Sequence, residues 1–342
     1  MPEFGSETDA IDVVKAFPEQ VKGRTCKYLH YKRDAAHTSI DGISSKVLIT
    51  GPSPGGLGAE SAISLAHGAP STIILVGRSA EKCLPTISAI KAINALTEVK
   101  FVEAEISSLK SVRKAAHSIL EDKSIPSIDV IINNAGVMAI PLARNENGYE
   151  MHFACNHLGH FLLTSSLIPK LTPRTGRVVN VSSSGNLYSP VNWDDVHFRG
   201  ENSYKPFSGY SQSKSAQILF SVALRKRGIK SYALHPGSIG THLGVHLTPE
   251  LMEDVTQTIF GLSLEEALKS EEYAKLKTLQ QGCATQLVAA LDPALDEQDD
   301  VFLSDCKPTH KPTLVHARAL DEKDAERMWT LSEDLVGESF DF

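Results

Sequence analysis

The chain contains 342 residues and carries a formal net charge of −7, with 34 lysines and arginines against 41 aspartates and glutamates. Its composition, 42% hydrophobic and 22% charged residues, is that of a globular protein with one large α/β domain or two smaller ones. The negative charge, and the lack of a basic stripe interleaved with aromatic residues, argue against nucleic acid as a partner.

The cysteines and the first residues of the chain bear on the cellular compartment. No two cysteines form a Cys-x-x-Cys pair, which favours a reducing compartment and argues against structural zinc. The N-terminus has no basic region followed by an apolar core, and no run of about eighteen apolar residues occurs anywhere. We therefore predict a cytoplasmic protein without a membrane span. The five cysteines are Cys26, Cys83, Cys155, Cys283 and Cys306.

The first 45 residues differ from the rest of the chain. An amphipathic pattern predicts a short helix over Thr8–Val21, whereas Cys26–Ser45 shows neither helical nor strand periodicity. We interpret residues 1–45 as an N-terminal extension that contains a short helix and an irregular insertion.

From Lys46 onward, short apolar and β-branched runs alternate with helical stretches, the pattern of repeated βαβ units. We predict an α/β fold with a single doubly wound parallel sheet of the Rossmann type, about seven strands wide, with helices on both faces. The predicted strands are Lys46–Thr50, Thr72–Val76, Val99–Glu103, Asp129–Ile132, Arg177–Val181, Lys230–Leu234 and Val301–Leu303.

The first predicted strand runs directly into a glycine-rich turn, Gly51 to Gly58, and then into an alanine-rich helix. Glycines let the backbone approach a pyrophosphate, whose charge the N–H groups and dipole of the helix N-terminus stabilise. A turn rich in glycine and proline is also common without any ligand. Its position after the first core strand favours a dinucleotide-binding turn.

The second strand ends in Val76-Gly77-Arg78-Ser79, without the acidic residue that accepts hydrogen bonds from both ribose hydroxyls of NAD. A guanidinium at Arg78 can pair with the 2′-phosphate of NADP and stack on the adenine, and Ser53 or Ser79 can add a hydroxyl. The sequence therefore predicts NADP(H) as cofactor; a solvated surface arginine is the alternative.

Tyr210 and Lys214 are four residues apart, so a helix places both side chains on one face. A neighbouring ammonium would lower the tyrosine pKa and fit it for proton transfer. Ser183, at the end of a predicted strand, would donate a hydrogen bond to a substrate carbonyl. The spacing alone is weak, since Tyr28 and Tyr273 also precede a lysine by four residues, and Tyr210 can instead be a structural helix tyrosine.

Three histidines, His152, His157 and His160, lie close together on the predicted crossover helix of residues 149–171. No cysteine or acidic cluster accompanies them, so we predict no metal site.

Several motifs in the same order resemble those of the short-chain dehydrogenase/reductase family, and within it the retinol-dehydrogenase-like and fungal secondary-metabolism branch. The resemblance covers about residues 46–319. The motifs are Thr50-Gly51 to Gly58, Asn133-Asn134-Ala135-Gly136, Asn156-His157-Leu158-Gly159-His160, Ser183, Tyr210 to Lys214, and Pro236-Gly237-Ser238-Ile239-Gly240-Thr241.

The resemblance implies a role for each motif. Ser183, Tyr210, Lys214 and Asn156 would be catalytic, with Asn156 holding a water that links Lys214 to solvent. Lys214 would also bind the nicotinamide ribose, and the backbone after Pro236, with Thr241, would fix the carboxamide. The implied cofactor-binding residues are Gly51, Ser53, Gly56, Leu57, Gly58, Arg78, Ser79, Glu105, Ile106, Asn133, Ala135, Gly136, Tyr210, Lys214, Pro236, Gly237, Ile239 and Thr241.

The chain departs from the family pattern at three places. The glycine turn is one residue longer, which makes Gly55 the inserted residue. Glu105-Ile106 stands where the family has an aspartate beside the adenine. A stretch of about twenty residues separates Val21-Lys22-Gly23-Arg24-Thr25 from the first strand, and we interpret it as a surface insertion.

Ser183 and Tyr210 are 27 positions apart, about twice the spacing of many family members. The added segment, residues 184–209, is rich in aromatic residues, which supply apolar contact area to a substrate or anchor the segment to the body. A second substrate wall is expected from a lid over about residues 242–277. The aromatic residues are Tyr188, Trp193, Phe198, Tyr204 and Phe207.

Together these features predict a catalytic domain over residues 46–320 and a C-terminal helix and tail over residues 321–342. The predicted activity is NADP(H)-dependent interconversion of a carbonyl and an alcohol on a fairly apolar small molecule. Two alternatives remain: an isomerase or cyclase that uses NADP(H) structurally or transiently, and a binding protein that senses the cofactor. The resemblance also implies a homodimer or homotetramer.

Overall fold

A computed structural model describes residues 3–22, 45–270 and 275–342. The seven predicted strands and a short additional strand form one sheet in the order β3-β2-β1-β4-β5-β6-β7-β8, parallel except for the last pair. The predicted irregular insertion, apart from Ser45, lies outside the described residues. The strands are β1 (Lys46–Thr50), β2 (Thr72–Gly77), β3 (Glu98–Glu103), β4 (Val130–Asn133), β5 (Arg177–Val181), β6 (Lys230–His235), β7 (Phe302–Ser304) and β8 (Lys307–Pro308).

Strand β8 is the one strand of the sheet that the sequence pattern does not predict. It has two residues and pairs antiparallel with β7 through a tight turn at Asp305 and Cys306. A run this short has no periodicity, and Pro308 argues against a strand except at an edge, which is where β8 lies.

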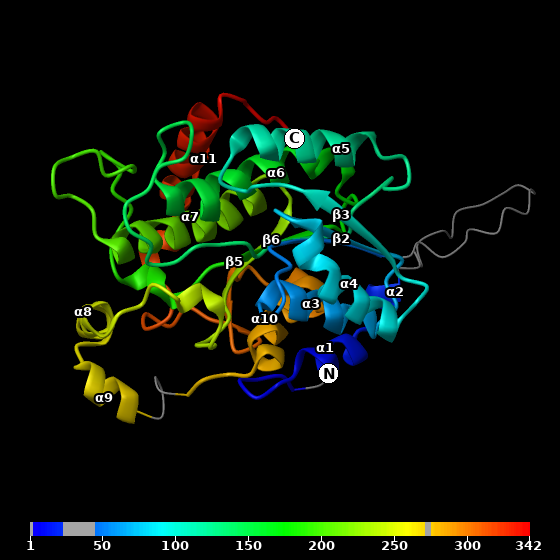
Figure 1. Ribbon diagram of the computed structural model, residues 1–342, viewed down its shortest axis with the longest axis horizontal. Helices are drawn as coiled ribbons and strands as arrows, with labels where there is room; N and C mark the ends of the chain where they lie inside the picture. Colours follow the sequence, from blue (N-terminus) through cyan, green and yellow to red (C-terminus); the bar gives the residue numbers. More distant parts are fainter. Residues whose placement is uncertain (1–2, 23–44, 271–274) are drawn as a thin grey trace, which may run out of the picture.

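Helices cover both faces of the sheet (Figure 1), with α5, α6, α7 and α11 on one face and α1, α3, α4 and α10 on the other. Helices α8 and α9 stand away from the sheet. The helices are α1 (Ala10–Ala16), α2 (Pro18–Lys22), α3 (Leu57–Ala66), α4 (Ala80–Ile93), α5 (Leu109–Glu121), α6 (Gly159–Leu167), α7 (Pro206–Lys226), α8 (Pro249–Phe260), α9 (Leu264–Lys269), α10 (Leu279–Leu291) and α11 (Glu322–Val336), with a π-helix η1 (Phe153–Leu158) and short 3-10 helices at Ile168–Lys170, Ser184–Leu187, His242–Gly244, Pro293–Glu297 and Ala317–Leu320.

Alternation along each central strand divides the core into two layers. In β1, Leu48 packs with the α5–α6–α7 layer, whereas Val47 and Ile49 pack with the α3–α10 layer. Successive side chains of a strand point to opposite faces, so a sheet covered on both faces needs apolar residues at every position. This requirement explains why the strands are continuous apolar runs.

The predicted N-terminal helix over Thr8–Val21 is two helices in the structure, α1 and α2. Phe17 leaves the helical conformation, with φ −123° and ψ 54°, because Pro18 has no N–H group and restricts the residue before it. Val13, Val14 and Val21 are fully buried against the α3–α10 layer, so this segment is part of the core of the fold.

The order of the strands reverses between β1 and β4, which are neighbours although β2 and β3 lie between them in the chain. Such a switch point opens a crevice at the carboxyl ends of the strands, where doubly wound proteins bind ligands. The glycine turn after β1 and the Asn133–Gly136 turn after β4 both lie there. No helix in the described part of the chain is long and apolar enough to span a membrane.

Candidate active site

The glycine turn forms a backbone surface that side chains would fill. Gly51 has φ +70°, and a Cβ atom added to it would lie 2.8 Å from the Cα atom of Ala135. A Cβ atom on Gly58, in the first turn of α3, would lie 2.5 Å from the carbonyl oxygen of Gly51. The close approach leaves the N-terminal N–H groups of α3 facing the crevice, which is the environment that a pyrophosphate requires.

The extra residue of this turn was assigned to Gly55. Gly55 has φ +73°, and nothing lies within 4 Å of the Cβ position, whereas Gly56 caps the N-terminus of α3. An exposed tip at Gly55 fits that assignment. Ser53, also exposed, has a carbonyl oxygen that accepts a hydrogen bond from the Gly56 N–H at 3.0 Å.

The Thr50 hydroxyl joins the two turns of the crevice. It accepts hydrogen bonds from the N–H groups of Asn134 and Ala135, both at 2.9 Å, and bonds to Nε2 of His160 at 2.9 Å. Nδ1 of His160 bonds to the carbonyl oxygen of Asn156 at 2.9 Å. Burial lowers the pKa of His160 to about 4, so the ring is neutral. It then donates from Nδ1 to that carbonyl and accepts the Thr50 hydroxyl proton at Nε2.

Asn133 and Asn134 are adjacent at the end of β4. The sequence analysis predicted a cofactor contact for Asn133. The buried Asn133 side chain instead donates to Thr164 Oγ1 and Asn180 Oδ1, both at 2.9 Å, and so ties β4 to β5 and α6. Asn134, which the sequence analysis missed, donates to the carbonyl oxygens of Thr50 and Gly51 at 2.9 and 3.3 Å. The one sequence feature that could have pointed to Asn134 was its position directly after Asn133.

Asn156 lies in the π-helix η1 and is fully buried. Its side chain accepts from the Val137 N–H at 2.9 Å and donates to the Val137 carbonyl at 3.0 Å and to Ser213 Oγ at 2.9 Å. It thus fixes the strand-to-helix turn that follows Gly136. π-Helical turns are rare and concentrate at functional sites, but no sequence pattern predicted this one.

Ser183, Tyr210 and Lys214 lie close together, as predicted. Ser183 follows the end of β5, and Tyr210 and Lys214 are on α7. Pro206 begins α7, where a missing N–H group costs nothing, and Tyr210, Lys214 and Gln217 share one face. The Ser183 hydroxyl lies close enough to the Tyr210 hydroxyl to influence its pKa. A Cβ atom on Gly185 would lie 2.9 Å from the Tyr210 ring. The lack of a side chain at Gly185 therefore leaves room for Ser183 and Tyr210 to lie close together.

The electrostatics of this group differ from the prediction. Burial raises the pKa of Tyr210 to about 12, although the hydrogen bond with Ser183 lowers it in part. Lys214 Nζ lies 5.5 Å from the centroid of the Tyr210 ring and donates to the Val181 carbonyl at 2.7 Å and to Gln217 Oε1 at 2.8 Å. Burial lowers the pKa of Lys214 to about 7. The expected lowering of the tyrosine pKa is not found, because desolvation outweighs the effect of Ser183, the group that lowers it.

At the adenosine end of the crevice, Arg78 Nη1 lies 3.6 Å from Glu105 Oε2, and both side chains are well exposed. The other carboxylate oxygen of Glu105 accepts from the N–H and hydroxyl of Ser107. Ser79 caps α4, because its Oγ atom accepts from the Lys82 N–H at 3.3 Å. Its hydroxyl proton and the guanidinium of Arg78 therefore both remain available at one helix N-terminus.

Four further predicted cofactor residues lie in the loops that follow β3 and β6. Ile106 is buried, and its carbonyl oxygen would lie 1.9 Å from a Cβ atom on Gly159, so α6 begins in contact with this loop. Gly237 has φ +94°. Ile239 packs where a Cβ atom on Gly282 of α10 would lie, beside Leu57. Thr241 caps a short 3-10 helix by accepting from the Leu243 N–H at 3.3 Å.

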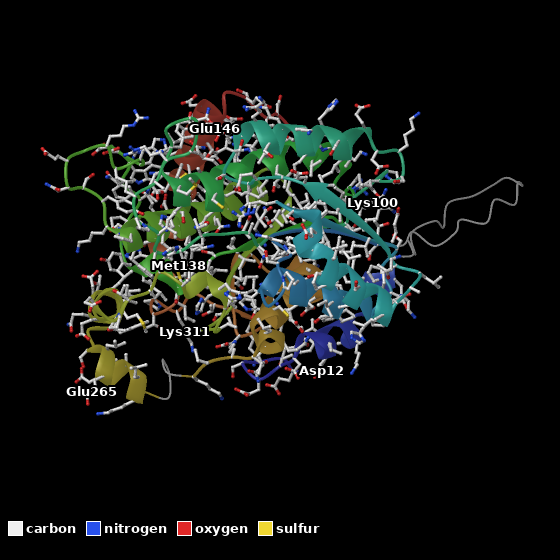
Figure 2. The ribbon with its side chains drawn as sticks, in the orientation of Figure 1. Asp12, Lys100, Met138, Glu146, Glu265 and Lys311 are labelled. Carbon is white, nitrogen blue, oxygen red and sulfur yellow. The ribbon has the colours of Figure 1, made fainter. Side chains whose placement is uncertain are left out.

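An apolar cluster surrounds Tyr210 on the side away from the sheet. Ala139, Tyr188, Phe207 and Tyr210 form its buried part. Helix α8 adds Leu251, Val255 and Ile259, which are spaced four residues apart and therefore form one stripe on the helix; Met138 and Leu247 complete the cluster. Met138 is labelled in Figure 2, on the side of the body nearest α8.

The aromatic residues of the 184–209 segment fall into two groups. Tyr188 and Phe207 belong to the cluster around Tyr210. Trp193 stacks under Arg327 of α11 at 4.4 Å, and Phe198 packs edge-on against Tyr204. Trp193 thus anchors the segment to α11, whereas Phe198 and Tyr204 pack against each other within it.

The three histidines of the crossover point to different partners. His152 bonds to Glu150, His157 to Ser332 and His160 to Thr50. Among the described residues, no group of three or more histidine, cysteine or acidic side chains is arranged to hold a metal ion.

A glycine turn at the switch point of a doubly wound sheet, with a half-buried serine and a buried tyrosine and lysine nearby, defines a dinucleotide-dependent oxidoreductase. The sequence model of the short chain dehydrogenase family matches residues 45–195. The chain belongs to the short-chain dehydrogenase/reductase family, among its retinol-dehydrogenase-like members.

Three relatives illustrate the similarity. Human retinol dehydrogenase 14 is 34% identical over 265 residues, which cover 76% of this chain and 72% of that protein. The short-chain dehydrogenase/reductase prx1 of Penicillium roqueforti is 32% identical over 309 residues, 86% of this chain and 85% of that one. The crystal structure of an uncharacterised protein from Mycobacterium paratuberculosis superimposes with a TM-score of 0.61 at 30% identity, covering 87% and 95% of the two chains.

The hydrogen-bonded position of Thr50 predicts a stability effect. Thr50→Val leaves the Asn134 and Ala135 N–H groups and His160 Nε2 without their partner, so we expect a loss of about 1–3 kcal/mol in the free energy of unfolding. Thr50→Ser keeps the hydroxyl and should lose less, about 1 kcal/mol. Urea unfolding of the three proteins measures both changes, and an equal loss in the two variants would show that the hydroxyl is unimportant.

Proposed function

We propose that the protein is an NADP(H)-dependent oxidoreductase that interconverts a carbonyl and an alcohol on a fairly apolar small molecule, working as a ketone or aldehyde reductase. The observation that carries the proposal is the convergence of Ser183, Tyr210, Lys214 and Asn156 beside the glycine turn. The apolar cluster around Tyr210 supports the substrate class. The names of the retinol dehydrogenases that resemble this chain support an apolar alcohol or aldehyde as well.

The crevice offers contacts for each part of the cofactor. The backbone of Gly51–Gly58 and the N-terminus of α3 would take the pyrophosphate, and Arg78 with Ser79 the 2′-phosphate. Gly136 allows close approach to the reacting end, because a Cβ atom there would lie 3.2 Å from Asn156 Oδ1 and 3.8 Å from Lys214 Nζ. The third donor of Lys214, beyond its bonds to Val181 and Gln217, would serve the ribose.

The catalytic side chains would act on the substrate oxygen. When bound, the reduced cofactor supplies the hydride. Ser183 and Tyr210 would donate hydrogen bonds to the carbonyl oxygen, and Tyr210 would transfer its phenolic proton to that oxygen as its negative charge develops. Lys214, with Asn156 beside it, would then return a proton to the phenolate.

The electrostatics favour reduction. A carbonyl reductase needs a proton donor, and burial, which raises the pKa of Tyr210 to about 12, keeps the phenol protonated at neutral pH. Oxidation of an alcohol would require the phenolate, whose formation the same burial opposes.

Replacing Tyr210 by Phe tests the proposal. We expect kcat to fall by about 10²- to 10⁴-fold, the usual contribution of a general acid, while the Kd for NADPH changes little. The measurement is NADPH oxidation in the presence of a panel of apolar ketones and aldehydes, with calorimetry for the cofactor. Tyr232→Phe, on β6, is a control for the loss of a buried phenol.

Three outcomes separate the possibilities. Full turnover by the Tyr210 variant would contradict the acid role. Product formed by the wild-type protein without net oxidation of NADPH would identify the isomerase or cyclase alternative. Cofactor binding without any turnover would favour a sensor.

Arg78→Ala tests the choice of cofactor. Loss of charge-assisted hydrogen bonds to the 2′-phosphate should weaken NADPH binding about 10- to 100-fold, with little change for NADH. Glu105→Gln should strengthen NADPH binding, because it removes a negative charge 3.6 Å from Arg78. Calorimetry with both dinucleotides measures the effect, with Arg199→Ala as an exposed-arginine control. A similar loss for NADH and NADPH in the Arg78 variant would argue against 2′-phosphate recognition.

The lowered pKa of Lys214 predicts a pH dependence. Its ammonium form is lost as pH rises through about 7, so kcat for reduction should be highest below that pH and fall above it. Gln217→Glu places a carboxylate next to Lys214 Nζ, which favours the ammonium, and should move the fall upward by about one to three pH units. A pH profile of kcat at saturating substrate and cofactor tests both, and a kcat independent of pH up to 9 would rule out the ammonium as proton source.

A further inference from the structure

Lys277 lies directly behind the Pro–Gly loop, residues 236–241, yet belongs to a distant part of the chain, just before the N-cap of α10. Its N–H group donates to the Ser238 carbonyl at 2.8 Å, and Lys277 pairs with Ile239 in an isolated parallel bridge. Only 9% of its side chain is exposed. Lysine is rarely so buried without a specific partner.

The aliphatic part of the side chain runs against Gly237. A Cβ atom on Gly237 would lie 2.7 Å from Cδ and 2.9 Å from Cε of Lys277, and φ at Gly237 is +94°. Lys277 therefore occupies the space that a side chain at position 237 would need. The loop is held by backbone pairing on one side and by these methylene groups on the other.

Asp305 determines where the charged end of Lys277 lies. Nζ of Lys277 forms an ion pair with the Asp305 carboxylate. Asp305 and Cys306 form the β7–β8 turn with φ of +49° and +63°, values that are strained for residues other than glycine. The Cys306 N–H donates to Thr285 Oγ1 of α10 at 3.1 Å, which helps to hold the turn. Strained backbone maintained by its surroundings often accompanies function, and here it presents a carboxylate to Lys277.

The charges of the same pair also act on His235, the last residue of β6, which contacts the residue after the proposed catalytic serine. Nδ1 of His235 accepts from the N–H group of Ser184, next to Ser183, at 3.1 Å. Burial, together with the positive charge of Lys277, lowers the pKa of His235 to about 4, so the ring stays neutral and Nδ1 can accept. The negative charge of Asp305 has the opposite effect and favours a higher pKa for His235.

We propose that Lys277, held by Asp305, is a positioning residue that sets the Pro–Gly loop against the nicotinamide end of the cofactor. The inference rests on the proposed function, because that function assigns the loop to the nicotinamide carboxamide. Lys277 touches the loop and neither the substrate nor the reacting atoms. Its removal displaces the nicotinamide ring relative to Ser183 and Tyr210, while the pyrophosphate and adenosine contacts of the crevice remain.

Two variants separate charge from packing. Lys277→Met keeps an aliphatic chain beside Gly237 and removes the ion pair, and Asp305→Asn keeps the shape of the turn. In both we expect kcat to fall about 10- to 100-fold, the effect of a small misplacement of reacting groups. The Kd for NADPH and the KM for the carbonyl substrate should change less than about threefold. Lys277→Arg, which restores a cation, should recover most of kcat.

A second readout is independent of turnover. The fluorescence of bound NADPH reports the surroundings of its nicotinamide ring, so its emission should change in Lys277→Met and return in Lys277→Arg. Lys100→Met is the matched control. Lys100 is on β3, at the opposite edge of the sheet (Figure 2), and its ammonium lies 2.9 Å from the Asp122 carboxylate. This variant should leave kcat and emission as in the wild-type protein.

The outcomes distinguish this inference from the proposed function. Wild-type kcat and emission in Lys277→Met would overturn the positioning role alone. The same would follow if Lys277→Arg failed to recover activity, or if kcat fell only in proportion to a loss of folded protein in urea unfolding. A wild-type protein that binds no dinucleotide would overturn both proposals, whereas one that binds NADPH without turnover leaves the emission to decide the role of Lys277.

Discussion

The crevice depends on one hydroxyl group. Thr50 stands at the end of β1, where its Oγ atom accepts two backbone N–H groups from the turn after β4 and bonds to His160 of α6. His160 in turn bonds to the carbonyl oxygen of Asn156. The glycine turn, the β4 turn and the π-helix η1 thereby share one hydrogen-bonded junction. Each donor at this junction has a single matching acceptor. The network therefore fixes both the tautomer of His160 and the position of the two turns relative to each other.

Burial controls the chemistry more strongly than the spacing of Tyr210 and Lys214. An exposed lysine one helical turn away would lower a tyrosine pKa, but both groups are buried at the carboxyl edge of the sheet. Desolvation penalises whichever form is charged, which raises the pKa of Tyr210 to about 12 and lowers that of Lys214 to about 7. The result is a protonated acid beside a lysine that titrates near neutrality, an arrangement suited to giving a proton and receiving another.

The sequence was informative wherever a structural requirement is local. Strands buried on both faces must be continuous apolar runs, so all seven strands of the predicted parallel sheet were found, and Gly51 and Gly58 follow from the tight turn after β1. The sequence did not predict the break between α1 and α2 at Pro18, the π-helix around Asn156, the hydrogen bonds of Asn134 or the contact of Lys277 with the Pro–Gly loop. Apart from the proline, these depend on contacts between segments far apart in the chain; Lys277 gains its meaning from Gly237 and Asp305, neither of which is near it in sequence.

The attachment of α8 to the body differs from that of the helices that cover the sheet. Helix α8 has no buried residue, and it meets the body through the stripe of Leu251, Val255 and Ile259 and through Asp254, which accepts a hydrogen bond from Tyr188 and pairs with Lys205 at 3.7 Å. The apolar stripe and the two polar contacts of Asp254 thus hold α8 against the body without burying any of its residues. The attachment point is the 184–209 segment, whose Trp193 is fixed to α11. The long segment between Ser183 and Tyr210 therefore supplies an anchored support for α8 beside the apolar cluster around Tyr210.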